Sequence, residues 1–573
     1  MKVDQRLLIT LTSLAFTTPL AAAGAAARSS SDGATSSANA TTPMVDLGYA
    51  KYQGTIVKDS VTGSTNSQFL GIRFAAPPTG ALRFSAPALP SPTPSVQLAD
   101  TQPPICFQTN PWGLSNTSPF LQQNGTSSRL PVVDDGKGSS DPRFSEDCLF
   151  LNVVTPGRIG EKRNLPVVVW IHGGGYATGS AYGSVRFGAF YDGNDLVRES
   201  GGEVVAVILQ YRLGAFGFLA GEKVKKGGAL NAGLLDQQFA LKWVQNHISK
   251  FGGDPRKVTI WGESAGAGSV MQHVIANGGK TKPSLFRAAI TSSAYLPSQY
   301  KYNSRIPETI YNQVVSLTNC TSSTDTLECL RQAPVEVLQA ANAAILQNGF
   351  FGTYTFVPVV DGSFITDSPT NLIRQGKVNT RNLYSVTNSF EGDIFVNQTQ
   401  ASTMPATDYI SQLYPTLSTR EVAAIAKKYS GLGSNFTQAA LIMGDSVFFC
   451  PTYLMLNNLG RSTFKAEFAF PPATHGADLS YYFNGGKFAE GVNVDAATAF
   501  AQSFMNFVKH RNPSVQDTLS NISLAKWKPW TGENEMVFNQ TSTGAADVRP
   551  VSTSTDLMTR CRLWESLSHS TSQ

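Results

Sequence analysis

The chain has 573 residues, of which 41% are hydrophobic and 15% charged, and its formal net charge is +5. This composition is typical of a globular protein long enough to bury a large core. A positive charge that is so small and so dispersed argues against nucleic acid as a partner and favours a neutral small molecule.

The first residues have the pattern of a secretory signal peptide. Lys2 and Arg6 precede an apolar run at 7–23, and small residues follow it. The run contains several hydroxyl residues and ends in alanines, and no later apolar run reaches the length of a membrane-spanning helix. We therefore expect a signal peptide at 1–27, a disordered leader rich in Ser, Thr, Ala and Gly at 28–43, and a secreted, extracellular protein without stable membrane insertion.

Six cysteines, an even number, suit the oxidising compartment that a signal peptide implies. Their pairing stays open, because six cysteines can be joined in many ways and nearest-neighbour pairing is only one of them. Secretion also makes Asn-x-Ser/Thr sequons candidates for N-glycosylation. The sequon asparagines are Asn39, Asn116, Asn124, Asn319, Asn397, Asn435, Asn521 and Asn539.

Short apolar runs typical of strands recur along the chain, with helical segments between them. This alternation predicts an α/β fold with a mostly parallel sheet and helices on both faces, and no internal linker divides the chain. In such a sheet the functional residues gather at the carboxyl ends of strands. Metal-ligand spacings and a glycine-rich dinucleotide fingerprint are both missing from the sequence, so we expect no metal and no cofactor. The predicted strands lie at 165–171, 204–211, 257–261, 288–292, 383–387 and 466–470.

A glycine run, His172-Gly-Gly-Gly175, follows the strand at 165–171. Residues without side chains let backbone N–H groups approach a carbonyl oxygen that gains negative charge during acyl transfer. Gly174 and Gly175 are therefore candidate donors of an oxyanion hole, together with Ala265 further along the chain. The alternative is a flexible glycine turn.

The pentapeptide Gly262-Glu-Ser-Ala-Gly266 lies between the strand at 257–261 and a predicted helix at 264–276. A serine on a sharp turn between a strand and a helix is typical of a nucleophile elbow, and flanking glycines leave room around its strained backbone. Because chance also produces such a pentapeptide, the interpretation depends on the flanking strand and helix. They predict that Ser264 is a nucleophile.

An active serine needs a histidine to take its proton and a carboxylate to orient that histidine. His475 follows a predicted strand in a loop and is the candidate base. Glu391 follows the preceding predicted strand and is the favoured acid, because the expected chain order is serine, acid, histidine. Asp393 and Asp361 are the alternatives.

These motifs, together with several longer stretches, resemble the type-B carboxylesterase/lipase family of α/β-hydrolases, which includes fungal extracellular lipases and cholinesterases. The similarity extends over most of residues 44–565, and its stretches are together highly specific. They are FLGIRFAAPPTGALRF at 69–84, EDCLFLNVVTP at 146–156, HGGGYATGS at 172–180, YRLGAFGFL at 211–219, NAGLLDQQFALKWVQNHISKFGGDPRKVTIWGESAGAGSV at 231–270 and CRLWESL at 561–567.

The resemblance implies an α/β-hydrolase fold, with a mostly parallel central sheet and large loop and helix insertions, in a single catalytic domain at 44–573. It implies that Ser264 is the nucleophile, Glu391 the acid and His475 the base, acting on a small-molecule ester. The implied oxyanion donors are Gly174, Gly175 and Ala265, and the implied disulfides are Cys106 to Cys148, Cys320 to Cys329 and Cys450 to Cys561.

The function that we favour is a secreted serine esterase working through an acyl-enzyme. Fungal lipases of the family use the loop at 106–148 as an amphipathic lid. In this chain the loop carries sequons at Asn116 and Asn124 and many Gly, Ser and Pro residues, which disfavour a regular amphipathic helix. An interfacial triacylglycerol lipase or a sterol esterase is the alternative, followed by a non-catalytic binding protein, which the presence of all three candidate triad residues disfavours. Substrate specificity and oligomeric state have no signature in the sequence.

Overall fold

The computed structural model describes residues 42–109, 112–121, 142–183, 190–460, 462–515 and 519–573. Residues Thr42–Gln573 form one compact unit. The expected signal peptide, nearly all of the expected leader, Asn39, Asn124 and the middle of the loop at 106–148 lie outside the described residues, so the predictions made for them stay predictions.

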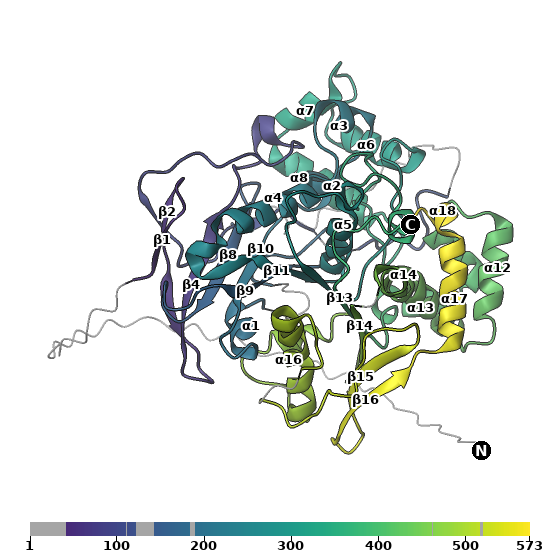
Figure 1. The fold of residues 1–573 in the computed structure, drawn as a ribbon. Helices are drawn as coiled ribbons and strands as arrows, with labels where there is room; N and C mark the ends of the chain where they lie inside the picture. The colour runs from purple at the N-terminus through teal and green to yellow at the C-terminus, as the bar shows by residue number, and fades with distance from the viewer. Residues whose placement is uncertain (1–41, 110–111, 122–141, 184–189, 461, 516–518) are drawn as a thin grey trace, which may run out of the picture. The chain divides into compact units, whose positions relative to one another are not determined.

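An 11-stranded sheet runs through the described part of the chain (Figure 1). Its central strands pair in parallel in the order β10-β9-β11-β12-β13-β14-β15, while β8, β4 and β3 on one side and β16 on the other join in antiparallel pairs. The predicted α/β class with a mostly parallel sheet is confirmed. The strands are β3 (Thr55–Lys58), β4 (Thr65–Arg73), β8 (Phe150–Pro156), β9 (Leu165–Ile171), β10 (Val205–Leu209), β11 (Gly253–Glu263), β12 (Ala288–Ser292), β13 (Leu383–Asn388), β14 (Thr463–Phe468), β15 (Asn534–Gln540) and β16 (Ala546–Ser552).

Two smaller sheets lie outside the large one, formed by β1 (Met44–Asp46), β2 (Lys51–Gln53) and β5 (Val96–Leu98), and by β6 (Ile105–Cys106) and β7 (Phe144–Ser145). Alternate residues of a strand face opposite layers. In β9, Val167 and Ile171 belong to one buried cluster, and Val168 and Trp170 belong to another. The first cluster includes residues of α4 (Ala232–His247) and α5 (Ala265–Gly279), and the second includes residues of α1 (Gly193–Glu199) and α16 (Val494–His510) (Figure 1). Helices therefore cover both faces of the sheet.

The remaining helices belong to the insertions between strands and to the segment after β16. They are α2 (Gly214–Phe218), α3 (Glu222–Gly227), α6 (Arg305–Leu317), α7 (Thr326–Gln332), α8 (Val335–Gln347), α9 (Pro369–Arg374), α10 (Gln398–Ala401), α11 (Ala406–Leu413), α12 (Thr419–Tyr429), α13 (Asn435–Gly444), α14 (Cys450–Leu459), α15 (Leu479–Tyr482), α17 (Thr555–Ser566) and α18 (Ser568–Thr571).

Two strands begin earlier than the sequence predicts. The strand predicted at 257–261 is β11, which begins at Gly253. The other is β14. We expected it at 466–470, but β14 runs from Thr463 to Phe468. The difference arises at Lys465, a charged residue that is fully buried inside the strand. Its ammonium group lies 3.0 Å from Glu535 on the neighbouring strand and donates to Thr387 at 2.8 Å. A prediction based on apolar runs excludes charged residues, so it misses a strand segment that contains a buried, paired charge.

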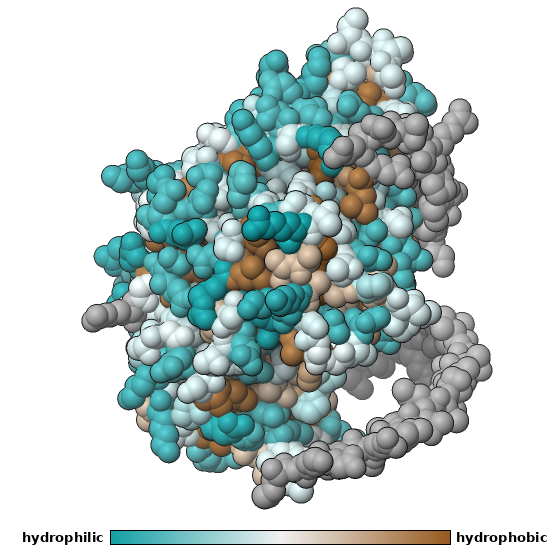
Figure 2. Space-filling model, turned by 90° about the vertical axis from the view of Figure 1, so that its right-hand side faces the viewer, coloured by the Kyte–Doolittle hydropathy of each residue, from teal (hydrophilic) through white to brown (hydrophobic). Residues whose placement is uncertain are grey.

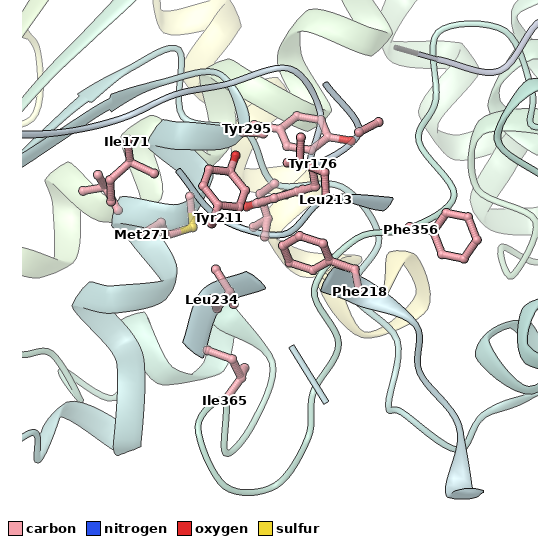
Figure 3. Close-up of a cluster of buried hydrophobic side chains, with 14 of the residues drawn as sticks. Ile171, Tyr176, Tyr211, Leu213, Phe218, Leu234, Met271, Tyr295, Phe356 and Ile365 are labelled. Atoms are coloured by element: carbon pink, nitrogen blue, oxygen red, sulfur yellow. The ribbon is translucent and has the colours of Figure 1, made fainter. Parts of the chain in front are cut away.

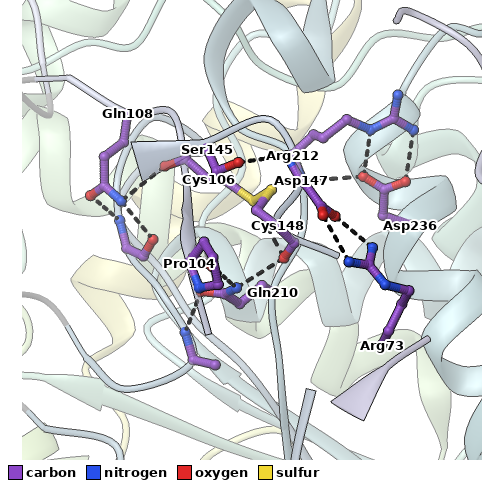
Figure 4. Close-up of a disulfide and its surroundings, with 12 residues drawn as sticks. Arg73, Pro104, Cys106, Gln108, Ser145, Asp147, Cys148, Gln210, Arg212 and Asp236 are labelled. Carbon is purple, nitrogen blue, oxygen red and sulfur yellow. Dashed lines mark hydrogen bonds and ion pairs between the residues drawn. A yellow bond between two sulfur atoms is a disulfide. The ribbon is translucent and has the colours of Figure 1, made fainter. Parts of the chain in front are cut away.

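The three disulfides that the resemblance implies are present in the structure, joining Cys106 to Cys148, Cys320 to Cys329 and Cys450 to Cys561. The first closes the base of the loop at 106–148 (Figure 4). Next to it, Arg73 of β4 holds both carboxylate oxygens of Asp147 at 2.5 and 2.7 Å, and Gln210 donates to the Cys148 carbonyl at 2.9 Å. The base of this loop is therefore anchored to the large sheet.

Among the described residues, one helical run is long and apolar enough to cross a membrane, and the sequence reading did not anticipate it. It spans Asn435–Leu459 and comprises α13, a π-helical turn at Asp445–Phe449 and α14. Because 89% of its most apolar window is buried inside the protein, protein side chains already cover it. Its burial is that of a core helix.

The sequon asparagines within the described residues all reach the surface. Asn116, Asn319 and Asn521 are exposed, and Asn397, Asn435 and Asn539 are half-buried. Glycosylation at these positions stays a prediction.

Candidate active site

Ser264 lies on a tight turn between β11 and α5. Its backbone has φ of +56° and ψ of −125°, a conformation that costs a non-glycine residue about 1–3 kcal/mol. A Cβ atom on Gly262 would collide with the backbone of Gly266, and one on Gly266 would collide with the Ile171 carbonyl. The Ser264 N–H donates to the Ser292 carbonyl at 2.9 Å, which ties the turn to β12. The strand, turn and helix expected here are present, and crowding explains both glycines.

His475 is held by a buried carboxylate. Its Nδ1 lies 2.7 Å from Glu391 Oε2, and Glu391 is fully buried. The other oxygen, Glu391 Oε1, accepts hydrogen bonds from the Ser293 hydroxyl and the Asn388 N–H, each at 2.7 Å. A carboxylate that is fixed in this way favours the imidazole tautomer with the proton on Nδ1, which leaves Nε2 free to accept a proton.

The two alternative acids have other surroundings. Asp361 accepts several backbone N–H bonds from its own loop and a hydrogen bond from the Asn231 amide, so it stabilises a turn. Asp393 opens a short 3-10 turn, and burial raises the pKa of its carboxyl group. Of the three candidates, Glu391 is the one that hydrogen-bonds His475 within the described residues.

Two further carboxyl groups lie around the imidazole, and the sequence reading missed both. Glu263 Oε1 lies 3.2 Å from His475 Nε2, and burial raises the pKa of Glu263 above its usual range. Asp478 accepts hydrogen bonds from the Asn388 amide and the Tyr482 hydroxyl, each at 3.1 Å, and burial raises the pKa of Asp478 to about 6. The sequence contained features that could have indicated both carboxyl groups. Glu263 is the second residue of the elbow motif, and Asp478 lies three residues after His475.

These carboxyl groups change the proton affinity of His475. Burial by itself lowers the pKa of an imidazole, but the nearby Glu263 and Glu391 outweigh that effect, and the pKa of His475 is raised. An imidazolium that forms here is therefore stabilised. The rings of Phe395 and Phe448 pack against it, with centroids 4.9 and 4.6 Å from the imidazole centroid. Over the described ranges, His, Cys, Asp and Glu side chains form no group of three or more that could hold a metal ion.

The glycine run after β9 packs directly on the elbow. A Cβ atom on Gly173 would lie 3.0 Å from the Ser264 Cβ atom. Gly174 and Gly175 have φ of +94° and +62°, the left-handed region that favours glycine. Their N–H groups donate to no other group among the described residues. Ala265 is the first residue of α5, so no helical carbonyl precedes it to accept a hydrogen bond from its N–H. Three N–H groups are therefore available beside Ser264.

His172, which opens the glycine run, supports the loop. Its ring stacks on Tyr211 with centroids 4.4 Å apart, and its carbonyl accepts the Tyr211 hydroxyl at 2.8 Å. Its Nδ1 lies 2.9 Å from the Gly173 carbonyl. Burial lowers the pKa of His172 to about 4, so the ring is uncharged at neutral pH. Figure 3 shows Tyr211 near Ile171 and Tyr176, in the apolar cluster that supports this loop.

An apolar chamber adjoins the glycine run that follows β9. It has a volume of about 930 Å³, including open solvent at its mouth. Tyr354 lies between the chamber and the glycine run, since a Cβ atom on Gly175 would overlap the Tyr354 ring. Tyr295 packs edge-on against Tyr354, with centroids 5.8 Å apart. Ser264 is not part of the lining, which includes Phe120, Phe218, Tyr295, Ile310, Phe356, Tyr414 and Val447.

Comparison with known proteins agrees with this fold. A family model described as "Carboxylesterase family" matches residues 41–559. Lipase 2 of Geotrichum candidum is 32% identical over 515 residues, which cover 82% of this chain and 87% of that protein. Carboxylesterase patB of Penicillium expansum is 30% identical over 83% of this chain and 89% of its own length. The crystal structure of Aspergillus niger EstA matches with a TM-score of 0.77 at 28% identity, covering 93% of this chain and 99% of that one. The chain belongs to the carboxylesterase family and is a hydrolase of carboxylic esters.

Proposed function

We propose that this protein is a secreted serine esterase that works through Ser264, His475 and Glu391 and an acyl-enzyme intermediate. The observation that carries the proposal is the 2.7 Å hydrogen bond between His475 and the buried Glu391, beside the strained turn that presents Ser264. Secretion is supported by the signal-peptide pattern at 1–27 and by the three disulfides, which persist in oxidising compartments. In this proposal residues 44–573 act as a single catalytic domain.

Acylation begins when Ser264 Oγ attacks the carbonyl carbon of the ester. His475 Nε2 takes the hydroxyl proton and then delivers it to the departing alcohol, while Glu391 keeps the imidazole oriented and stabilises its charged form. The N–H groups of Gly174, Gly175 and Ala265 donate to the carbonyl oxygen as it becomes negative, and losing one such donor typically costs about 3 kcal/mol of transition-state stabilisation.

Deacylation repeats these steps with water. His475 Nε2 removes a proton from a water molecule as that water attacks the acyl-enzyme carbonyl, and the proton returns to Ser264 Oγ when the acid leaves. In the structure His475 Nε2 lies 3.2 Å from Glu263 Oε1. Catalytic hydrogen bonds are often poorly aligned before substrate binds and tighten in the complex, so we expect Nε2 to turn to Ser264 when an ester occupies the site.

The chamber behind Tyr354 supports an ester that carries an apolar chain. Each methylene that moves from water into such a chamber contributes about 0.8 kcal/mol, so several methylenes outweigh the small ester group itself in binding. Opening the chamber to Ser264 requires the Tyr354 ring to move from its place beside Gly175. The substrate class that we propose is therefore an ester of a medium or long hydrocarbon chain.

An interfacial lipase, or a sterol esterase, is the second candidate. It is favoured by the exposed Leu114 and Leu121, which flank the chamber-lining residues Ser118 and Phe120, and by the similarity to a lipase of Geotrichum candidum. On the face that Figure 2 shows, hydrophobic residues form patches broken up by hydrophilic ones. Docking on a lipid surface calls for a larger continuous apolar patch than this face offers. We favour dissolved esters because the loop at 106–148 is rich in Gly, Ser and Pro and carries two sequons, which disfavour an amphipathic lid helix.

Replacing Ser264 with alanine tests the proposal. We expect Ser264→Ala to abolish p-nitrophenyl ester turnover and labelling by a fluorophosphonate probe, while the protein still folds and is secreted. Ser316→Ala, which changes an exposed serine on α6, is the matched control and should keep both. Turnover that survives in folded Ser264→Ala protein would overturn the proposal, and a folded wild-type protein that neither turns over nor labels would favour a non-catalytic binding protein.

Esterase and lipase are separated by how the rate depends on substrate concentration. For an esterase, the rate of p-nitrophenyl butyrate or tributyrin hydrolysis should saturate below the solubility limit of the ester and show no jump beyond it. A jump at the solubility limit would favour the lipase. The Ser264→Ala protein provides the blank for both substrates.

A further inference from the structure

Two segments that line the chamber run side by side along its wall. One contains Tyr295, and the other contains Val447 in the π-helical turn between α13 and α14. The Leu296 N–H donates to the Val447 carbonyl at 2.9 Å and joins the two segments directly. Phe448, the next residue of the turn, packs against His475. This turn therefore forms part of the chamber wall and also contacts the candidate base.

Gln573 joins the same two segments from behind. Its side chain is buried, and its Nε2 donates to the Leu296 carbonyl at 2.7 Å and to the Ser446 carbonyl at 2.9 Å. Its Oε1 accepts a hydrogen bond from the Thr571 hydroxyl at 2.9 Å. These three bonds fix which end of the amide faces the wall, because an oxygen in place of the nitrogen would face two carbonyl oxygens.

The sequence explains why the Ser446 carbonyl takes a donor from outside its helix. In the π-helical turn the Cys450 N–H donates to the carbonyl of Asp445, five residues earlier. In the same register the Ser446 carbonyl would receive the N–H of residue 451, but that residue is Pro451, which has none. A buried carbonyl without a partner is destabilising. Gln573 supplies the missing donor.

The segment at 568–573 makes two more ties to chamber-lining chain. The Ser572 carbonyl accepts the N–H of Gln299, which lies between two lining residues, at 2.6 Å. The Ser570 carbonyl accepts the Thr416 hydroxyl at 2.6 Å, next to a third lining stretch. Three stretches of the wall that are far apart in sequence therefore share one support.

We propose that Gln573 is a positioning residue that fixes the wall of the chamber and thereby sets how long an ester chain the enzyme accepts. This rests on the proposed function, in which the chamber receives the apolar chain of the ester. Without the Gln573 amide, the segments of Tyr295 and Val447 lose a common anchor, and the wall no longer fits a long chain. A short ester does not reach this wall and keeps its contacts with the elbow and the oxyanion loop.

Gln573→Met is the test, because methionine has a similar length and no donor. We measure kcat and KM for p-nitrophenyl esters from acetate to palmitate, with fluorophosphonate titration to count active Ser264. The acetate kcat/KM should stay within about twofold of wild type, while KM for decanoate rises by about 5- to 20-fold and its kcat is retained. An equal loss along the whole series, or an unchanged chain-length profile, would overturn the proposal.

Two further variants distinguish a specific change in the chain-length profile from a loss of activity caused by misfolding. Gln375→Met changes an exposed glutamine that does not line the chamber, and it should leave the chain-length profile unchanged. Thr571→Val removes only the hydroxyl that orients the Gln573 amide, and it should shift the profile in the same direction by a smaller factor. If Gln573→Met does not fold, Thr571→Val provides the test of the proposed role of Gln573. An unshifted chain-length profile in folded Thr571→Val protein would then contradict that role.

Pro451→Ala tests the role of the missing N–H. It restores a backbone donor at residue 451, so the KM change caused by Gln573→Met should be smaller in the Pro451→Ala background. An equal change in both backgrounds would overturn the account of the Ser446 carbonyl. The two proposals can be overturned separately. Ester turnover by the Ser264→Ala protein would overturn the proposed function. If Ser264 is essential but Gln573→Met leaves the chain-length profile unchanged, only the role of Gln573 is overturned.

Discussion

His172 and His475 are both buried beside Ser264, yet their surroundings drive their pKa values in opposite directions. His172 stacks on Tyr211 and has a backbone carbonyl as its hydrogen-bond partner, so burial dominates and lowers its pKa to about 4. His475 is as deeply buried, but Glu263 and Glu391 contact it, and its pKa is raised.

The difference teaches what separates a supporting histidine from one that is suited to act as a base. Burial favours the neutral imidazole at both positions, since charge is costly in a medium of low polarity. Only carboxylates within contact distance compensate for that cost, and only then can the ring accept a proton during a reaction. We therefore expect that changing the carboxylates around His475 alters catalysis, and that changing His172 mainly alters the pH dependence of stability.

The largest effect is expected from Glu391→Gln, which removes the charge that orients His475. The imidazole then loses its preferred tautomer and its stabilised charged form, and kcat for p-nitrophenyl acetate should fall by about 10⁴-fold. Asp393→Asn is the matched control and should stay within about twofold of wild type. If the two variants lost activity equally, Glu391 would not be the acid of the triad.

A smaller effect is expected from Glu263→Gln. Removing this carboxyl group takes away one of the influences that raise the pKa of His475, so that pKa should fall. In the proposed function His475 must be neutral to act as the base, so activity should be lost as the pH drops through its pKa. The acid limb of kcat/KM should therefore move to lower pH, while the weaker stabilisation of imidazolium lowers kcat at the plateau by about tenfold. A full pH profile of kcat/KM measures both, and an unmoved acid limb would contradict the role given to Glu263.

His172→Phe should change stability and leave the acid limb of activity in place. The folded protein keeps His172 neutral down to about pH 4, whereas the unfolded chain protonates it below about pH 6.5. The unfolded state therefore binds more protons between these values, and His172 removes about 3 kcal/mol of stability as pH falls through this window. Between pH 6.5 and 4 the variant should lose about 3 kcal/mol less than wild type in its free energy of unfolding. Denaturant unfolding at both pH values measures this, and parallel curves would contradict it.

Much of the fold and of the candidate site followed from local patterns. The strand before Ser264, the helix after it and the two flanking glycines lie within a short stretch of chain, so steric rules apply to them without knowledge of the rest. The parallel sheet followed from the alternation of strands and helices. Because such a sheet gathers the carboxyl ends of its strands, loops containing Glu391 and His475 were expected to meet, and the structure has them in contact.

Other features depend on partners that are distant in sequence. The start of β14 was not predicted because it contains the charged residue Lys465. That charge is buried because it pairs with Glu535, on a strand some 70 residues later. Likewise, the run Asn435–Leu459 has the composition of a membrane span, and only the surrounding protein identifies it as a core helix. A pattern within one segment contains no information about which other segment covers it.

The amino-acid sequence by itself determined the sheet class, the strained turn at Ser264 and the chain order of the candidate serine, acid and histidine, because short-range sterics and strand topology govern them. Tertiary structure alone decided that Glu263 faces His475, that Tyr354 packs on Gly175, and that Gln573 hydrogen-bonds the two segments containing Leu296 and Ser446. The physical reason is the distance along the chain over which each interaction acts. Backbone strain acts between neighbours in the chain, whereas burial, proton affinity and the shape of a chamber depend on side chains that only folding brings together.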